Sequence, residues 1–327
     1  MSMLVATVLL APVAYRFEPN VRLDYRVDVM FDGFLPILGG NEGKAEVGMK
    51  VAVAGLAGDN GFQRATSEMT EFTIAFNGGK LPLTVDDARQ YFPKTQISMT
   101  PQGKVVKSDA PNISLPVRLP GLDIKRFPDI SYLPVELPEG DVSQGTKWEF
   151  KRQFGSTDIV YQCEATSLKD SMLDINVKIE QEYTQFENDA LEIVAEEKDA
   201  VAQVTTKMTG SGLVKFDVNR GVAVSVNMSN KSSSKVVNIK SKKETTRVLN
   251  SGLKVQLLGP AGAAKPPVPT APKSTGNSLL DLWNKGLKAG QDLWVRSTEY
   301  LNALKLLVQF TLSSAPGLGG LPIRFPF

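Results

Sequence analysis

The chain has 327 residues, of which 42% are hydrophobic and 22% charged, so it is long enough to bury a core and is not disordered throughout. Its 37 basic and 35 acidic residues leave a formal charge of +2, a balance that does not indicate nucleic acid as a partner. Histidine is absent and cysteine occurs once, which excludes Ser-His-Asp and Cys-His catalysis, thiolate metal clusters and an intrachain disulfide.

An apolar run from Met3 to Ala14 opens the chain and ends in small residues. We interpret residues 1–14 as a secretory signal peptide, with a buried first strand as the alternative, because no Lys or Arg precedes the run and Pro12 lies near its end. The first interpretation predicts a secreted or periplasmic protein of the bacterial cell envelope.

Alternating residues predict a first β-unit over residues 15–110. From Val21 to Val29, apolar and charged side chains alternate with the period of a half-buried strand. The residues 49–76 predict a hairpin that turns at 57–61, and residues 97–106 predict a second.

An apolar insert follows the first strand, between Asp32-Gly33 and Gly39-Gly40. Its large side chains are Phe34, Leu35, Ile37 and Leu38. Such an insert either folds over the sheet or forms a contact surface for an apolar ligand or a partner.

Two pairs of carboxylates are the candidates for acid and base catalysis. Asp86 and Asp87 follow Thr84 with the spacing of a capping box, which predicts a short helix from Val85 to about Phe92. Asp24 and Asp28 alternate with apolar residues, which predicts the solvent face of a strand. We prefer these structural roles to a carboxylate-dependent hydrolase and predict that the protein is not an enzyme.

Residues 111–140 are rich in proline yet keep many apolar side chains, which predicts an extended connector packed against the sheet. A second β-unit follows over residues 141–258, and its hairpin at 159–183 matches residues 49–72 in length, turn placement and closing aromatic residue. We interpret residues 15–110 and 141–250 as a duplication of one β-meander. Cys163 has apolar neighbours at alternate positions, so we expect a buried thiol.

An acidic segment at 187–199 precedes the last strands. Its carboxylates match no calcium-binding loop, so we predict a solvated loop, with no metal or cofactor. The opposite charge gathers in the last strand, and we interpret it as protection of an edge strand against aggregation, with an anion site as the alternative. The basic residues are Lys231, Lys235, Lys240, Lys242, Lys243 and Arg247.

Residues 204–248 predict three antiparallel strands joined by two tight turns, the first at 217–221 and the second at 230–234. The unit GSGLVKFDVNRGVAVSVNMSN within them resembles the strand-turn-strand units of bacterial envelope β-proteins, both the lipoprotein-carrier half-barrels (the LolA/LppX kind) and several secreted families. The resemblance implies a curved antiparallel sheet whose concave apolar face accepts an acyl chain. It carries over no individual binding residue.

The C-terminal part changes character. Residues 259–277 form a Pro/Ala-rich linker, residues 278–314 have the apolar spacing of an amphipathic helix, and residues 315–327 form a tail. Trp283 and Trp294 lie on the helix, which either docks on the β-domain, self-associates or lies in a membrane surface.

Together these patterns predict a mainly β protein of two similar antiparallel meander units, a curved sheet or half-barrel, with a short helix and a C-terminal amphipathic helix. The favoured function is a non-catalytic binding or structural component of the cell envelope. The alternative is a carrier of lipid or another apolar ligand on the concave sheet face.

Overall fold

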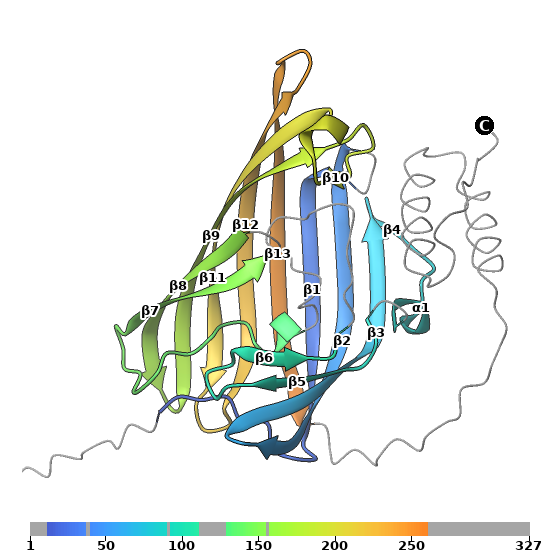
Figure 1. Cartoon of the computed structure of the whole chain (residues 1–327). Coiled ribbons are helices and arrows are strands. Elements are labelled where there is room, and N and C mark those ends of the chain that lie inside the picture. Colours follow the sequence, from blue (N-terminus) through green and yellow to red (C-terminus); the bar gives the residue numbers. More distant parts are fainter. Residues whose placement is uncertain (1–11, 37–39, 90–91, 111–128, 155–156, 261–327) are drawn as a thin grey trace, which may run out of the picture.

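The computed structural model describes residues 12–36, 40–89, 92–110, 129–154 and 157–260, and these form one antiparallel sheet of thirteen strands (Figure 1). The strands are β1 (Arg22–Leu35), β2 (Asn41–Asp59), β3 (Phe62–Phe76), β4 (Gly79–Lys80), β5 (Thr95–Met99), β6 (Val105–Ser108), β7 (Lys147–Phe154), β8 (Thr157–Lys169), β9 (Met172–Glu187), β10 (Ile193–Val194), β11 (Ala202–Asp217), β12 (Val222–Asn238) and β13 (Glu244–Pro260). The helical elements are α1 (Val85–Arg89) and the 3-10 turns η3 (Asp129–Ser131) and η4 (Glu197–Asp199). The mainly β, antiparallel prediction is confirmed.

The order of the strands is β6-β5-β3-β2-β1-β13-β12-β11-β9-β8-β7, with β4 beside β3 and β10 beside β9. Both halves are therefore meanders that progress along the sheet in the same direction. They meet where β1 pairs with β13. Asp24 lies opposite Leu258, and Asp32 lies opposite Asn250. The two predicted units are thus parts of one continuous sheet.

This junction overturns one prediction about the last strand. β13 was expected at an edge guarded by lysines, but it lies in the middle of the sheet between β12 and β1. The cause is a pairing between the two ends of the β-domain, which a pattern within the strand does not reveal. Lys235 instead pairs with Glu244 across β12 and β13, at 2.7 Å.

β1 also runs further than its alternation indicated, through Gly33 to Leu35. Gly33 has a φ of 131°, and a side chain there would collide with the backbone of Val248 on β13. Glycine lets the strand pass this close contact without ending. The predicted interruption at Asp32-Gly33 is therefore wrong.

One face of the sheet, which we call the inner face, carries nearly all the buried side chains. On β1 these are Leu23, Tyr25, Val27, Val29 and Phe31, while the charged residues between them point to the outer face. The same alternation runs along β9, from Leu173 to Ile179. A single core cluster joins the inner faces of both halves.

Two segments without regular structure cover one end of the inner face. The first contains Val13, Tyr15 and Phe17, all buried. Of these only Val13 falls within the predicted signal peptide, whose Pro12 is exposed and Ala14 half-buried. Cleavage near Ala14 would remove Val13 from the core. Residues 1–11 lie outside the described part of the chain.

The second covering segment is the end of the proline-rich connector, drawn in green before β7 in Figure 1. Its Tyr132, Leu133, Val135 and Leu137 are buried, as an extended packed connector requires. It spans between the two ends of the sheet order, because the Leu137 amide donates to the Gln102 carbonyl beyond β5 and the Trp148 indole of β7 donates to the Glu136 carbonyl. The tyrosine hydroxyl of Tyr15 donates to the Val135 carbonyl and ties the two segments together.

Neither the short helix nor the 3-10 turns of the described residues have the length and apolar character that crossing a membrane as a helix requires. The predicted C-terminal helix at 278–314 lies outside the described residues, as do the linker after Pro260 and the tail.

Candidate functional site

The middle of the inner face is an uninterrupted apolar surface. Strand register aligns one residue from each long strand into a row across the sheet. This row, here called the apolar row, consists of Ile74, Val47, Val29, Leu253, Met228, Gly212, Val177, Cys163 and Trp148. The next row toward the covered end is equally apolar: Phe72, Met49, Val27, Val255, Val226, Val214, Ile175 and Ala165.

The apolar row is only partly covered. Ile74, Val47 and Leu253 are half-buried although they point to the inner face, whereas Val29 and Met228 beside them are buried. These half-buried aliphatic side chains mark a part of the inner face that the described segments leave partly open.

Polar side chains join the inner face toward the β1–β2 turn. We call this region the polar end, and its polar side chains are Gln181, Gln185, Glu187, Thr206, Asn230, Ser232, Ser234, Arg247 and Ser251. Buried apolar residues lie among them: Tyr183, Val204, Met208, Val236 and Leu249. Gln181, Thr206, Ser232 and Glu187 are buried. Within a few residues along the strands, the inner face therefore changes from wholly apolar rows to a region with many hydrogen-bonding groups.

The charges of the polar end neutralise each other. The Arg247 guanidinium lies 2.5 Å from the Glu187 carboxylate, and the two side chains are 17% and 5% exposed. The Phe34 ring lies beneath the same guanidinium, 4.3 Å from its central carbon, a cation–π contact. Because burial removes water from both ions, this pairing is needed to keep them charged.

Three carboxamide oxygens of the polar end have no hydrogen-bond partner. They are Gln181 Oε1, Gln185 Oε1 and Asn230 Oδ1, each of them buried as an atom. Gln181 as a whole is 4% exposed. Unpartnered buried acceptors are rare in folded proteins, and these three lie on one surface.

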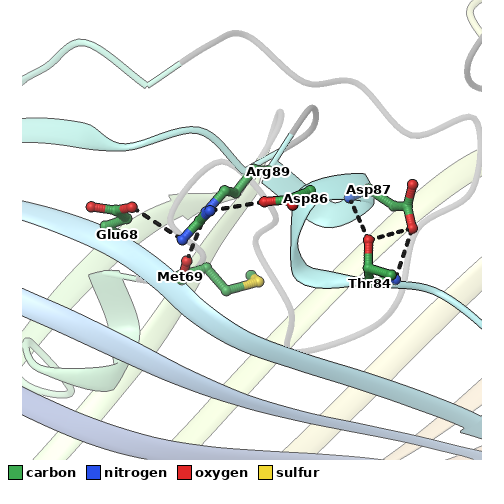
Figure 2. Close-up of polar contacts among 6 residues, drawn as sticks. All are labelled: Glu68, Met69, Thr84, Asp86, Asp87 and Arg89. Carbon is green, nitrogen blue, oxygen red and sulfur yellow. Dashed lines mark hydrogen bonds and ion pairs between the residues drawn. The ribbon is translucent and has the colours of Figure 1, made fainter. Parts of the chain in front are cut away.

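The candidate catalytic carboxylates Asp86 and Asp87 make structural contacts around α1 (Figure 2). The hydroxyl and amide of Thr84 both donate to the Asp87 carboxylate, and the Asp87 amide donates back to the Thr84 hydroxyl, so the predicted capping box is present. Asp86 accepts from Arg89, 2.9 Å away.

Asp24 and Asp28 are on the outer face as predicted. Each pairs with the arginine two residues before it on β1, Arg22 at 2.7 Å and Arg26 at 3.0 Å. Within the described ranges, no cluster of three or more acidic or thiol groups is arranged to hold a metal ion.

The Cys163 thiol is buried in the apolar row. Burial raises its pKa from 9.0 to about 12, against the opposing effect of the nearby Arg152 charge. The thiol is therefore protonated at neutral pH, and a protonated thiol is a poor nucleophile.

The predicted contact residues fall in different places. Leu35 is fully buried and Phe34 is half-buried beneath Arg247, but both are the last residues of β1 and pair with β2, so this part of the expected insert belongs to the sheet. Ile37, Leu38, Trp283 and Trp294 lie outside the described residues. The polar end was missed, and its sequence signal is the interruption of inward apolar residues on β9 by Gln181, Gln185 and Glu187.

A hollow of about 360 Å³ lies mostly on the opposite, outer face. Its lining includes Met30, Gly48 and Gly252 and the charged residues Arg26, Asp28, Glu46, Lys80 and Lys254. Val29, Val47, Ile74 and Met228 of the apolar row also line it.

Comparison with known proteins gives no family. No family model matches the chain, and no curated protein matches it. A solved structure described as "Lipid-protein interactions in lipovitellin" is similar over 77% of this chain and 26% of that chain, at 15% identity and a TM-score of 0.48. The structure of DynF from the dynemicin biosynthesis pathway of Micromonospora chersina is similar over 77% and 86% of the two chains, at 6% identity and a TM-score of 0.18.

The chain thus spans about a quarter of the length of the lipovitellin chain. Both TM-scores are low, and we take no ligand or activity from either structure.

Proposed function

We propose that this chain is a non-catalytic binding protein of the bacterial cell envelope, and that its inner sheet face takes up an acyl chain or another apolar ligand. The observation that carries the proposal is the apolar row, which has no polar side chain from Ile74 to Trp148 and is half-buried at Ile74, Val47 and Leu253. The envelope location rests on the apolar run of residues 3–14.

The hydrophobic effect supplies the affinity in this proposal. Each methylene moved from water onto an apolar surface contributes about 0.8 kcal/mol, so an acyl chain lying along several strands gains enough to offset its loss of freedom. The strands that lie from β2 to β8 in the sheet order form a rigid surface, since each of them is hydrogen-bonded to a strand on both sides.

A non-catalytic role is proposed because the candidate acids and bases are engaged elsewhere. Asp87 caps α1, Asp86 pairs with Arg89, and Asp24 and Asp28 pair with arginines of the outer face. None of these carboxylates lies on the inner face, where the ligand is placed.

Uptake of a fluorescent fatty acid by delipidated protein tests the proposal. Leu253→Asn places a polar group in the apolar row, and we expect it to weaken uptake about tenfold, because a desolvated amide opposes the acyl chain. Val248→Asn is a control on the same strand but on the outer face, where Val248 is 37% exposed, and should leave uptake unchanged.

Both variants are first compared with the wild type by circular dichroism and urea unfolding, so that only folded proteins are measured. Folded, delipidated wild-type protein that takes up no fatty acid would contradict the carrier role. A purely structural component of the envelope would then be the better interpretation of the sheet.

A further inference from the structure

We infer that the ligand of the inner face carries an uncharged head group with hydrogen-bond donors, such as hydroxyls, and that this head group binds the polar end. The inference rests on the proposed function and specifies its substrate class. It is carried by three features of the polar end: unpartnered acceptors, neutralised charges, and a position directly beside the apolar rows.

The unpartnered atoms are all acceptors, and the amide nitrogens of the same side chains already donate. Gln181 Nε2 donates to the Thr157 hydroxyl at 3.4 Å, and Asn230 Nδ2 donates to the Ser251 hydroxyl at 3.3 Å. Gln185 Nε2 donates to the Glu187 carboxylate at 3.0 Å. These contacts leave the three oxygens without a partner, and each oxygen is enclosed by its neighbours, so a ligand that donates to it must displace those neighbours.

A glycine on the neighbouring strand β11 leaves the space for the Asn230 carboxamide. Asn230 on β12 is paired with Gly210 on β11, and its amide lies over that glycine. Any side chain at Gly210 would occupy the same volume as the Asn230 carboxamide. Strand β11 therefore has no side chain at Gly210, and the Asn230 carboxamide occupies that space on the inner face.

The charges of the inner face disfavour an ionic head group. Arg247 is paired with Glu187, and Arg152 donates to the carbonyls of Leu133 and Pro134. An anionic head group would meet the Glu187 carboxylate without a free cation to bind. A cationic one would compete with Arg247 for the same carboxylate, so an uncharged donor fits best.

The polar end adjoins the apolar rows along the same strands. Asn230 and Met228 are successive inward residues of β12, and Gln181 follows Ile179 on β9. A ligand with one polar and one apolar part can therefore contact both regions at once. Its chain lies on the apolar row while its donors reach the carboxamides.

Displacement of a fluorescent fatty acid by three compounds with the same acyl chain tests the inference. The compounds are monopalmitoylglycerol, which offers hydroxyl donors, methyl palmitate, which offers none, and palmitate, which is anionic at pH 8. We expect monopalmitoylglycerol to displace the probe at a concentration about tenfold lower than either of the others.

Gln181→Met removes the acceptor and keeps the side-chain length. We expect this variant to bind methyl palmitate as the wild type does but to lose the preference for monopalmitoylglycerol. Its unliganded form should also unfold at a higher urea concentration, because an unsatisfied buried acceptor is gone. Gln162→Met on the exposed face of β8 is the matched control and should change neither property.

The outcomes separate the two proposals. If none of the compounds displaces the probe from folded protein, the proposed function itself fails. If all three displace it equally, or if Gln181→Met keeps the wild-type preference, the sheet binds acyl chains but the head-group inference is wrong. If Gln181→Met does not fold, Gln185→Met provides the same comparison at a half-buried position.

Discussion

Tyr15 ties the N-terminal segment to the rest of the core. Its ring is fully buried and packs edge-on against Phe216, with ring centres 5.1 Å apart. Gly103, beyond β5, lies against the same ring, with a φ of 90°. The close approach of ring and backbone requires the absence of a side chain at this position.

Gly103→Ala should therefore destabilise the fold strongly. A methyl group there would collide with the Tyr15 ring in addition to the cost of the left-handed backbone, which is about 1–2 kcal/mol for alanine. Gly140→Ala is the matched control, because Gly140 has a φ of 87° but nothing lies within 4 Å of the added methyl. Urea unfolding should show a clearly larger loss of unfolding free energy for Gly103→Ala, and equal losses would contradict this packing.

Alkaline pH should weaken the fold through four buried acids. Burial raises the pKa of Cys163 to about 12, and it also raises the pKa values of Tyr15, Tyr25 and Tyr132 above their usual 10.0. In the unfolded chain the thiol and the phenols release their protons from about pH 9 and 10, while the folded chain keeps them.

The unfolded state therefore binds fewer protons above pH 9, and the free energy of unfolding should fall as the pH rises. Each group contributes a slope of about 1.4 kcal/mol per pH unit above its unfolded pKa. Urea unfolding between pH 8 and pH 10.5 measures this fall, and Cys163→Ala should make it shallower at its lower end. If the free energy of unfolding stays constant up to pH 10.5, the buried thiol and phenols do not control the stability at alkaline pH.

At the scale of the elements, α1 protects an open strand edge. β5 pairs only with residues 63–67 of β3, and β4 pairs only with Ala75 and Phe76. Between them, the Arg89 guanidinium of α1 donates to the Met69 carbonyl and pairs with Glu68 (Figure 2). A short helix thus covers a stretch of backbone that would otherwise be open to another strand.

The capping box makes the two acidic residues of α1 unequal. Asp87→Ala removes the partner of both the Thr84 hydroxyl and its amide, and we expect a local loss of about 1 kcal/mol. Asp86→Ala removes only an exposed ion pair with Arg89 and should cost less than about 0.5 kcal/mol. Hydrogen exchange of the Ala88 and Phe92 amides, which close the helix, reports the difference; similar exchange in both variants would argue against the cap.

Turn chemistry explains why the hairpins could be predicted. The strands β2 and β3 are joined by Asn60 and Gly61 alone, with φ values of 50° and 83°. Such a turn needs residues that adopt positive φ, and the pair Asn-Gly predicts it from the sequence. The predicted turn at 57–61 was longer because Ala57, Gly58 and Asp59 also lack strand character as residue types, although they lie in β2.

At the scale of the whole molecule, the pairing of β1 with β13 makes the two halves one folding unit. β1 hydrogen-bonds to β2 on one side and to β13 on the other, so neither meander has a free edge at the junction. The connector adds a second link, because the buried Arg152 of β7 donates to its carbonyls at Leu133 and Pro134.

Removal of residues 261–327 should leave this sheet folded. β13 extends to Pro260, which pairs with Leu23, so the cut must follow Pro260 to keep the junction with β1 complete. We expect the truncated chain to keep the circular dichroism and the urea midpoint of the full chain. A cut after Gln256, which removes the end of β13, is the control and should lower the midpoint.

Should the chain cut after Pro260 aggregate or unfold, the C-terminal segment would be part of the core, and the predicted linker at 259–277 would be wrong. If it stays folded but loses uptake of fatty acid, the segment takes part in binding. Either outcome assigns a role to Trp283 and Trp294, whose docking, self-association and membrane contact remain predictions.

The turn predicted at 230–234 is wrong, because it lies within β12, which runs to Asn238. The sequence by itself determined most of the strands and of the other turns, and the short helix. These depend on alternation, turn residues and capping, which act within a few residues of each other, as in Val21 to Val29, Asn60-Gly61 and Thr84-Asp87. Only the tertiary structure decided that β13 joins β1, that Arg247 meets Glu187, and that the inward positions of separate strands align into an apolar row and a polar end. Those contacts join residues that are far apart in the chain, and strand register, which no local pattern encodes between β1 and β13, sets which of them meet.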